Sequence, residues 1–235
     1  MNLSYWETKS WLNNIDFAVI GSGIVGLSCA LNLRNKFPKA NIVILEKGVY
    51  PQGASTKNAG FACFGSPSEI LEDLQTHSEN EVLNLIEKRI NGFNKLKELL
   101  GEKNIGYKNF GGYEVFQSDD LVTFENCQNE INHINKILNP LFNSNVFEIK
   151  KNPFNFKNII NNCFFNSYEG QIDTGLMMES LIKKAYIENI KILNNINISS
   201  YYENNNHVEV KSEAFDFKCS KLFIATNGFA SKLLK

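Results

Sequence analysis

The chain has 235 residues, of which 43% are hydrophobic and 21% charged, a composition typical of a globular protein rather than a disordered one. Its formal net charge is −1, without a block of like charge or a long apolar stretch. We therefore expect no nucleic-acid partner, no membrane span, no signal peptide and a cytoplasmic location. The five cysteines form no C-x-x-C pair, which indicates free thiols in a reducing compartment and no metal site.

The N-terminal part of the chain has the pattern of one βαβ unit. A short apolar strand is predicted at Phe17–Ile20, followed by glycines and a helix that breaks near Pro38. A second buried strand is predicted at Ile42–Leu45. A loop rich in small residues, "GVYPQGASTKNAGFACFGSPSE", comes next.

The remainder reads as an inserted region and a return to the first sheet. Apolar residues three and four apart predict a helix over 83–100, and short strands surround a helical stretch at 123–139. The predicted elements after it are a helix over 173–189 and strands at Lys191–Leu193, His207–Lys211 and Leu222–Ala225. We expect Leu222–Ala225 to lie parallel beside Phe17–Ile20. The predicted fold class is α/β, with a Rossmann-like domain at 1–76 and 165–235 and an inserted partial α+β domain at 77–164.

The motif G-x-G-x-x-G, formed by Gly21, Gly23 and Gly26, carries the chemistry. It follows a predicted strand and opens a helix, so the backbone can approach a pyrophosphate at a helix N-terminus. Glu46 ends the second strand, where a carboxylate can accept a hydrogen bond from a ribose 2′-hydroxyl and repel a 2′-phosphate. These features predict an adenine dinucleotide and argue against NADP.

The loop after the second strand favours FAD over NAD, because an NAD domain usually continues with regular βα units. The stretches "IGSGIVGLSCALNL", "ILEKG", "GASTKNAGF" and "EGQIDTGLMMESLIKKA" together resemble the D-amino-acid oxidase and glycine oxidase family of FAD-dependent oxidoreductases. The resemblance covers nearly the whole chain and is strongest over the first 65 residues. Family members continue beyond the "ATNG" turn, so the resemblance also implies that a C-terminal portion is missing here.

The resemblance implies a set of FAD-binding residues but no catalytic residue. The glycine turn would hold the diphosphate, Glu46 the ribose, the segment 55–61 the diphosphate and flavin, the backbone of Ile198 the adenine, and the turn at 226–228 the flavin. The full set is Gly21, Ser22, Gly23, Ile24, Val25, Gly26, Glu46, Lys47, Ser55, Thr56, Asn58, Ala59, Gly60, Phe61, Ile198, Thr226, Asn227 and Gly228.

The activity implied by the resemblance is oxidation of a C–N bond in an amino acid or another amine, with hydride transfer to flavin N5 and O2 or another electron acceptor. Tyr113 and Phe116 are candidates for a substrate pocket, although aromatic residues in strands more often belong to the core. Cys63 and Lys57 are weaker candidates for contacts with the cofactor. Three alternatives stay open: an incomplete or split flavoprotein that binds FAD weakly without catalysis, the flavin domain of a tRNA-modifying enzyme, and an NAD-dependent dehydrogenase.

Overall fold

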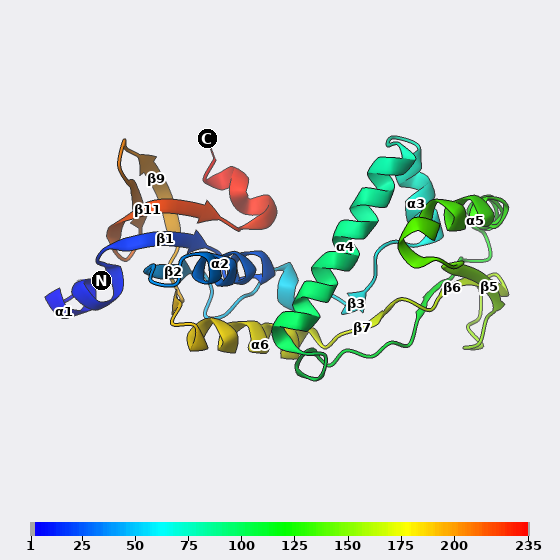
Figure 1. The fold of residues 1–235 in the computed structure, drawn as a ribbon, viewed down its shortest axis with the longest axis horizontal. Coiled ribbons are helices and arrows are strands. Elements are labelled where there is room, and N and C mark those ends of the chain that lie inside the picture. The colour runs from blue at the N-terminus through cyan, green and yellow to red at the C-terminus, as the bar shows by residue number, and fades with distance from the viewer. Residues whose placement is uncertain (1–2, 235) are drawn as a thin grey trace. The chain divides into compact units, whose positions relative to one another are not determined.

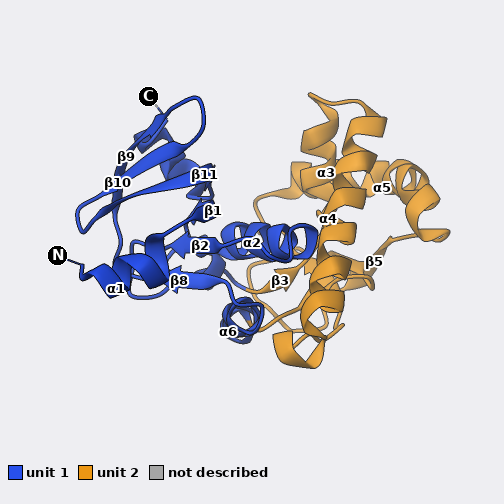
Figure 2. Ribbon diagram, turned by 60° about the vertical axis from the view of Figure 1, so that its left-hand side comes forward, with its two compact units in different colours: residues 1–59, 174–235 blue, residues 60–173 orange. Residues whose placement is uncertain are grey.

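The fold is that of a computed structural model, which describes residues 3–234. The chain divides into two compact units (Figure 2): unit 1 comprises residues 1–59 and 174–235, and unit 2 comprises residues 60–173. The segments 60–76 and 165–173 lie in unit 2, whereas the domain boundaries predicted from the sequence assigned them to the nucleotide-binding domain. They join unit 2 because Phe61–Ala62 (β3) pairs with Gly170–Gln171 (β7), and the Ile172 N–H donates to the Gly60 carbonyl.

Unit 1 is built on a six-stranded sheet with the order β8-β2-β1-β11-β10-β9. Figure 1 labels β9, β11, β1 and β2 of this sheet, and Figure 2 also labels β8 and β10. Its strands are β1 (Ile15–Ile20), β2 (Ile42–Leu45), β8 (Lys191–Leu193), β9 (Ile198–Glu203), β10 (Val208–Ser212) and β11 (Asp216–Ile224). Its helices are α1 (Tyr5–Glu7), α2 (Ile24–Lys36) and α6 (Thr174–Ile187), with a π-helix at Thr8–Leu12 and 3-10 helices at Ala54–Thr56 and Asn227–Lys232. Helix α2 packs against β1, β2 and α6.

The long strand β11 has two partners. Its first half pairs antiparallel with β10, and its second half pairs parallel with β1, with Ala18 opposite Leu222 and Ile20 opposite Ile224. The parallel pairing of these two segments is the one predicted from the sequence. Ala18, Ile20, Val43 and Leu45 belong to one buried cluster, which also includes Ile198, Val210 and Phe217 from the antiparallel strands.

Unit 2 combines helices with two small antiparallel sheets, β3-β7 and β4-β6-β5. Its elements are β3 (Phe61–Ala62), α3 (Pro67–Leu74), α4 (Glu79–Leu100), a 3-10 helix at Lys103–Ile105, β4 (Gly112–Glu114), α5 (Leu121–Phe142), β5 (Phe147–Lys151), β6 (Asn162–Asn166) and β7 (Gly170–Gln171). Capping boxes start two of the helices: Ser66 with Glu69 at α3, and Ser78 with Glu81 at α4.

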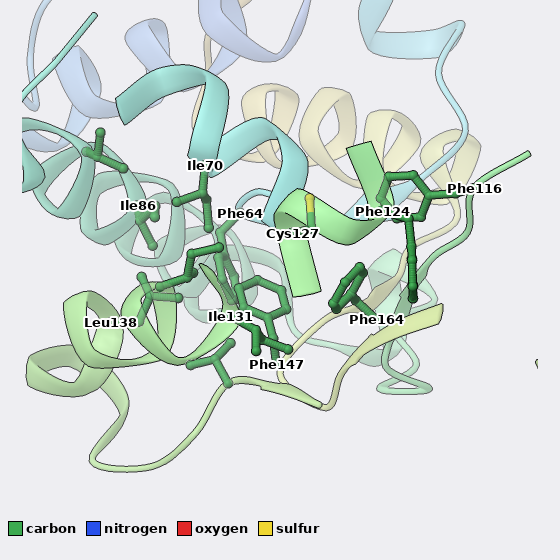
Figure 3. Close-up of a cluster of buried hydrophobic side chains, with 13 residues drawn as sticks. Phe64, Ile70, Ile86, Phe116, Phe124, Cys127, Ile131, Leu138, Phe147 and Phe164 are labelled. Carbon is green, nitrogen blue, oxygen red and sulfur yellow. The ribbon is translucent and has the colours of Figure 1, made fainter. Parts of the chain in front are cut away.

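The core of unit 2 is separate from that of unit 1. Phe64, Phe124, Ile134 and Phe164 lie in a cluster formed by α3, α4, α5 and the sheet β4-β6-β5 (Figure 3). Asn135 lies beside this core and is buried, but both polar atoms of its side chain have backbone partners: Oδ1 accepts from the Val146 and Phe147 N–H groups, and Nδ2 donates to the Phe147 carbonyl. A buried amide with these partners ties α5 to the start of β5 without an unpaired polar group.

Candidate cofactor-binding site

The glycine turn lies where β1 ends and α2 begins. Gly21 follows Ile20 with φ +99°, and its N–H donates to the Leu45 carbonyl at 2.8 Å. A Cβ atom on Gly21 would lie 2.6 Å from the Ala225 carbonyl oxygen, and one on Gly26 would lie 1.9 Å from the Gly21 carbonyl oxygen. The turn therefore requires glycine for its backbone angle at Gly21 and for close packing at Gly26.

The first turn of α2 presents backbone N–H groups that have no partner inside the helix. One of them, on Ile24, donates to Ser55 Oγ at 3.0 Å, so the 3-10 helix Ala54–Thr56 lies against the N-terminus of α2. The same hydroxyl lies 3.0 Å from the position that a Cβ atom of Gly23 would occupy. Val25, in the same turn, has an exposed side chain. The N-terminus of α2 carries the partial positive charge that favours an anion.

Glu46 lies at the carboxyl end of β2, beside the glycine turn. Its Oε2 accepts hydrogen bonds from the Ser22 N–H at 2.9 Å and from Ser22 Oγ at 2.7 Å, and its Oε1 accepts one from the Gly48 N–H at 2.9 Å. The neighbouring Lys47 is exposed. The carboxylate is thus fixed at the same edge of the sheet as the helix N-terminus.

The other polar residues of the loop after β2 mainly shape the loop itself. Thr56 Oγ1 donates to the carbonyls of Pro51 and Gly53 at 3.0 and 3.2 Å, and Asn58 Nδ2 donates to those of Ala54 and Ser55. Lys57 and Ala59 are exposed. Two further residues of the predicted set, Gly60 and Phe61, lie in unit 2, where Phe61 is exposed.

The turn at 226–228 belongs to the same edge of the sheet as the glycine turn. Thr226 Cγ2 lies 3.7 Å from the position that a Cβ atom of Gly21 would take, and its buried Oγ1 has no hydrogen-bond partner. Asn227 has φ +51° and, like Gly228, is exposed. An unpartnered buried hydroxyl beside a glycine turn is a group that a bound ligand can satisfy.

Ile198 starts β9 and its side chain is buried in the sheet cluster. The segment before it runs along the end of β2, because the Ile196 N–H donates to the Glu46 carbonyl at 2.9 Å and the Asn195 N–H to the Gly48 carbonyl at 3.0 Å. The structure therefore brings the segment that precedes Ile198 to Glu46. The contacts of Ile196, Gly48 and Ala225 with this edge of the sheet did not follow from the sequence. All three residues make these contacts through backbone groups, which leave no side-chain signal in the sequence, and most of their partners lie far along the chain.

The residues of unit 2 that the sequence suggested for a substrate pocket or a cofactor contact differ in exposure. Phe116 is buried in the core of unit 2 and is not a pocket residue. Tyr113 is partly exposed and packs against Phe154 and Phe165. Cys63 is exposed at its residue surface, yet partial burial of the thiol raises its pKa. This thiol therefore lacks the lowered pKa that marks a reactive cysteine.

A cavity of about 590 Å³ lies in unit 1 on α6 and the loop that precedes Ala54. Its walls include Tyr50, Met178, Ile182 and Tyr186, and of the predicted cofactor residues only Thr56 lines it. Because the glycine turn and Glu46 do not line this cavity, it is not the predicted dinucleotide site.

Helices within residues 3–234 are all too short or too polar to cross a membrane.

The geometry defines a class: a Rossmann-like dinucleotide-binding fold in which a glycine turn, a helix N-terminus and a carboxylate meet at one edge of a sheet. A family model described as DAO, FAD dependent oxidoreductase, matches residues 16–235. The chain belongs to this family of FAD-dependent oxidoreductases. The match also accounts for the α/β fold that the sequence predicted.

Solved structures of amino-acid-oxidising enzymes share the fold. Glycine oxidase from Bacillus cereus ATCC 14579 is 22% identical with a TM-score of 0.68, over 94% of this chain and 57% of that chain. NikD, an amino acid oxidase essential for nikkomycin biosynthesis, is 15% identical with a TM-score of 0.68, over 94% and 53%. L-proline dehydrogenase from P. horikoshii is 18% identical with a TM-score of 0.64, over 94% and 55%. The chain thus spans little more than half the length of these proteins, and no curated protein sequence matches it.

Proposed function

We propose that this chain binds FAD through unit 1 and is the FAD-binding part of an oxidoreductase that acts on the C–N bond of an amino acid or another amine. The observation that carries the proposal is the meeting of the glycine turn, the α2 N-terminus and Glu46 at one edge of the sheet. Membership of the FAD-dependent family supports the choice of FAD. The substrate class rests on the amino-acid-oxidising proteins that share the fold.

The residues fit an ADP moiety by the chemistry of their donors. The N-terminus of α2 and the close backbone approach at Gly23 suit a diphosphate, since both provide positive potential without a side chain in the way. Glu46 suits a ribose hydroxyl, and its negative charge disfavours the 2′-phosphate of NADP. The unpartnered hydroxyl of Thr226 provides a further polar group next to the glycine turn. The other residues of the predicted set stay proposals for the same site.

A bound flavin supplies the acceptor for a hydride from the carbon next to the substrate nitrogen. The protein then contributes mainly position and exclusion of water, which is why we assign no acid–base residue. Oxygen or another oxidant would then receive the electrons from the reduced flavin. Separately, the cytoplasmic location stays a prediction.

A second candidate function is FAD binding without catalysis by this chain alone. The observation in its favour is that the chain spans 57% of glycine oxidase and similar shares of the other proteins. The two functions share the cofactor site and differ only in turnover, so one set of experiments separates them.

Titration of the purified chain with FAD, followed by flavin fluorescence and calorimetry, tests the cofactor site. We expect saturable binding of FAD and weaker binding of NADP. The variant Glu46→Gln should lower the affinity for FAD about tenfold, because it removes a charged hydrogen-bond acceptor. The matched control Glu203→Gln, an exposed change on β9 of the same unit, should leave the affinity unchanged. Equal affinities in both variants would contradict the role of Glu46, and no saturable FAD binding would overturn the proposal.

Anaerobic mixing of the FAD-loaded chain with glycine, D-alanine or L-proline tests turnover. Loss of the flavin absorbance near the visible maximum indicates transfer of electrons from the substrate. Bleaching supports the oxidoreductase, whereas saturable FAD binding without bleaching by any of these amino acids supports binding without catalysis.

A further inference from the structure

Ser22 is a buried residue of the glycine turn whose two hydrogen-bond donors both serve Glu46. It lies between Gly21 and Gly23 and is 1% exposed. Its backbone N–H and its Oγ donate to the same carboxylate oxygen, Glu46 Oε2, at 2.9 and 2.7 Å. This contact links two segments 24 residues apart and is made entirely within unit 1.

The donor count excludes Ser22 as a direct ligand of a diphosphate. A serine hydroxyl has one proton to donate, and phosphate oxygens accept hydrogen bonds but do not donate them. In Ser22 this proton and the backbone N–H are both engaged by Glu46. Any effect of Ser22 on a bound dinucleotide is therefore exerted through Glu46.

The acceptor count on Glu46 limits what its carboxylate can bind. A carboxylate offers about four lone-pair positions over its two oxygens. Ser22 uses two of them at Oε2 and the Gly48 N–H uses one at Oε1. One lone-pair position, on Oε1, is left for a hydroxyl donor from a ligand. The three protein donors fix the orientation of the carboxylate and therefore the direction of this free position.

We propose that Ser22 is a positioning residue that holds the Glu46 carboxylate so that the glycine turn selects a dinucleotide whose adenosine ribose has a free 2′-hydroxyl. The inference deepens, and rests on, the proposed FAD site. Without the hydroxyl of Ser22, Glu46 keeps its charge but loses one of the donors that set its orientation. The selectivity for the 2′-hydroxyl then falls, while the binding of the diphosphate at the α2 N-terminus is retained.

Calorimetric titration with ADP and with 2′-deoxy-ADP tests this role, since the two nucleotides differ only in the group that Glu46 would contact. The wild-type chain should bind ADP about tenfold more tightly than 2′-deoxy-ADP. In Ser22→Ala the affinity for ADP should fall towards that for 2′-deoxy-ADP, so that the ratio of the two affinities decreases, while the affinity for 2′-deoxy-ADP stays unchanged because the Ser22 and Gly48 N–H groups are retained. Ser22→Thr retains the hydroxyl and should restore much of the difference. Ser199→Ala, which removes an exposed hydroxyl on β9, is the matched control and should behave as wild type.

The ratio of the two affinities separates positioning from general damage, because a misfolded turn weakens both nucleotides together. If Ser22→Ala does not fold, Ser22→Gly removes the same hydroxyl with less bulk and is measured instead. A ratio unchanged from wild type in a folded variant overturns the role of Ser22, while FAD binding still supports the proposed function. A wild-type chain that binds FAD but does not distinguish the two nucleotides also overturns this inference alone. Failure of the wild-type chain to bind FAD overturns both.

Discussion

Asparagine occupies the left-handed positions of the backbone in this protein. The non-glycine residues with positive φ within 3–234 are all Asn, at positions 14, 143, 155, 158, 189, 195 and 227. Asn tolerates this region better than other residues with a Cβ atom, because its short polar side chain can bond locally. Several of these positions end an element: Asn143 terminates α5, and Asn189 follows α6. The high Asn content thus has a structural use in turns and helix ends.

Asn143 gives a direct test of this use. Its φ is +51° at the C-terminus of α5, and its N–H donates to the Asn139 carbonyl at 2.8 Å. We expect Asn143→Ala to lower the free energy of unfolding by about 1 kcal/mol, because alanine is strained in this conformation. Asn143→Gly should be neutral or slightly stabilising. Urea unfolding followed by circular dichroism measures both, and equal losses in the two variants would show that side-chain contacts matter more than φ.

The candidate cofactor residues show how far the position of a single residue in the fold can be predicted. The places of Gly21 and Gly26 in the turn and of Glu46 at the end of β2 followed from the sequence, because their spacing along a βαβ unit reflects a backbone requirement and a fixed strand length. Their role in binding a cofactor stays a proposal. The contact of Ser55 with Ile24 did not, since the two residues are 31 positions apart and a loop serine has many possible partners. The engagement of both Ser22 donors by Glu46 was likewise not predictable, because it depends on side-chain rotamers.

At the scale of elements, the buried strands were predicted and the half-exposed ones were harder. Strands β2 and β8 have the predicted bounds, Ile42–Leu45 and Lys191–Leu193, because short apolar runs between turn residues leave little choice. Strand β9, "ISSYYE", was not predicted as a strand, because its serines and half-exposed tyrosines do not alternate clearly. In the structure it pairs antiparallel with β10.

Glu169, in the turn between β6 and β7, connects to the loop between β3 and α3 and makes the stability of unit 2 depend on pH. Its carboxylate accepts a hydrogen bond from the Phe64 N–H at 3.1 Å, and Arg89 Nη1 donates to the Phe64 carbonyl at 2.8 Å. Burial raises the pKa of Glu169 above its ordinary 4.5; the N–H groups of Phe64 and Gly65 lower it, and Glu69 and Glu114 raise it further. The folded state therefore holds this proton at higher pH than the unfolded state does.

Proton binding and folding are linked, so the raised pKa of Glu169 determines how the free energy of unfolding changes with pH. The contribution of Glu169 to stability is fully present below pH 4.5 and is lost as the pH rises through its raised pKa in the folded protein. In the wild-type chain this loss lowers the free energy of unfolding as the pH rises from 4.5 towards neutral. We expect Glu169→Gln, which cannot titrate, to show a smaller decrease in the free energy of unfolding over this range, as measured by urea unfolding at a series of pH values. The exposed change Glu125→Gln on α5 should leave the wild-type profile unchanged. A profile of Glu169→Gln that parallels wild type would contradict the assignment.

At the scale of the whole molecule, the two units have separate cores of similar character. Ile134 on α5 and Ile44 on β2 are both fully buried, one in each unit. Because each truncation leaves a cavity in only one core, we expect Ile134→Ala and Ile44→Ala each to cost roughly 3 kcal/mol in its own unit. Hydrogen exchange measured by mass spectrometry should show faster exchange in 60–173 for the first variant, and in the six-stranded sheet for the second. Faster exchange throughout the chain in either variant would show that the units unfold together.

The two-partner strand β11 has a consequence for the order of events on the ribosome. The parallel pair of β1 and β11 joins residues 15–20 to residues 219–224, so this pair forms only after about two hundred intervening residues have been translated. The Ala225 carbonyl, which packs against Gly21, arrives with it. Unit 2, whose residues are continuous in the chain, can acquire its structure during this interval. The nascent glycine turn therefore lacks its neighbouring strand until residues 219–224 have been translated, and the site that we propose for FAD is complete only afterwards.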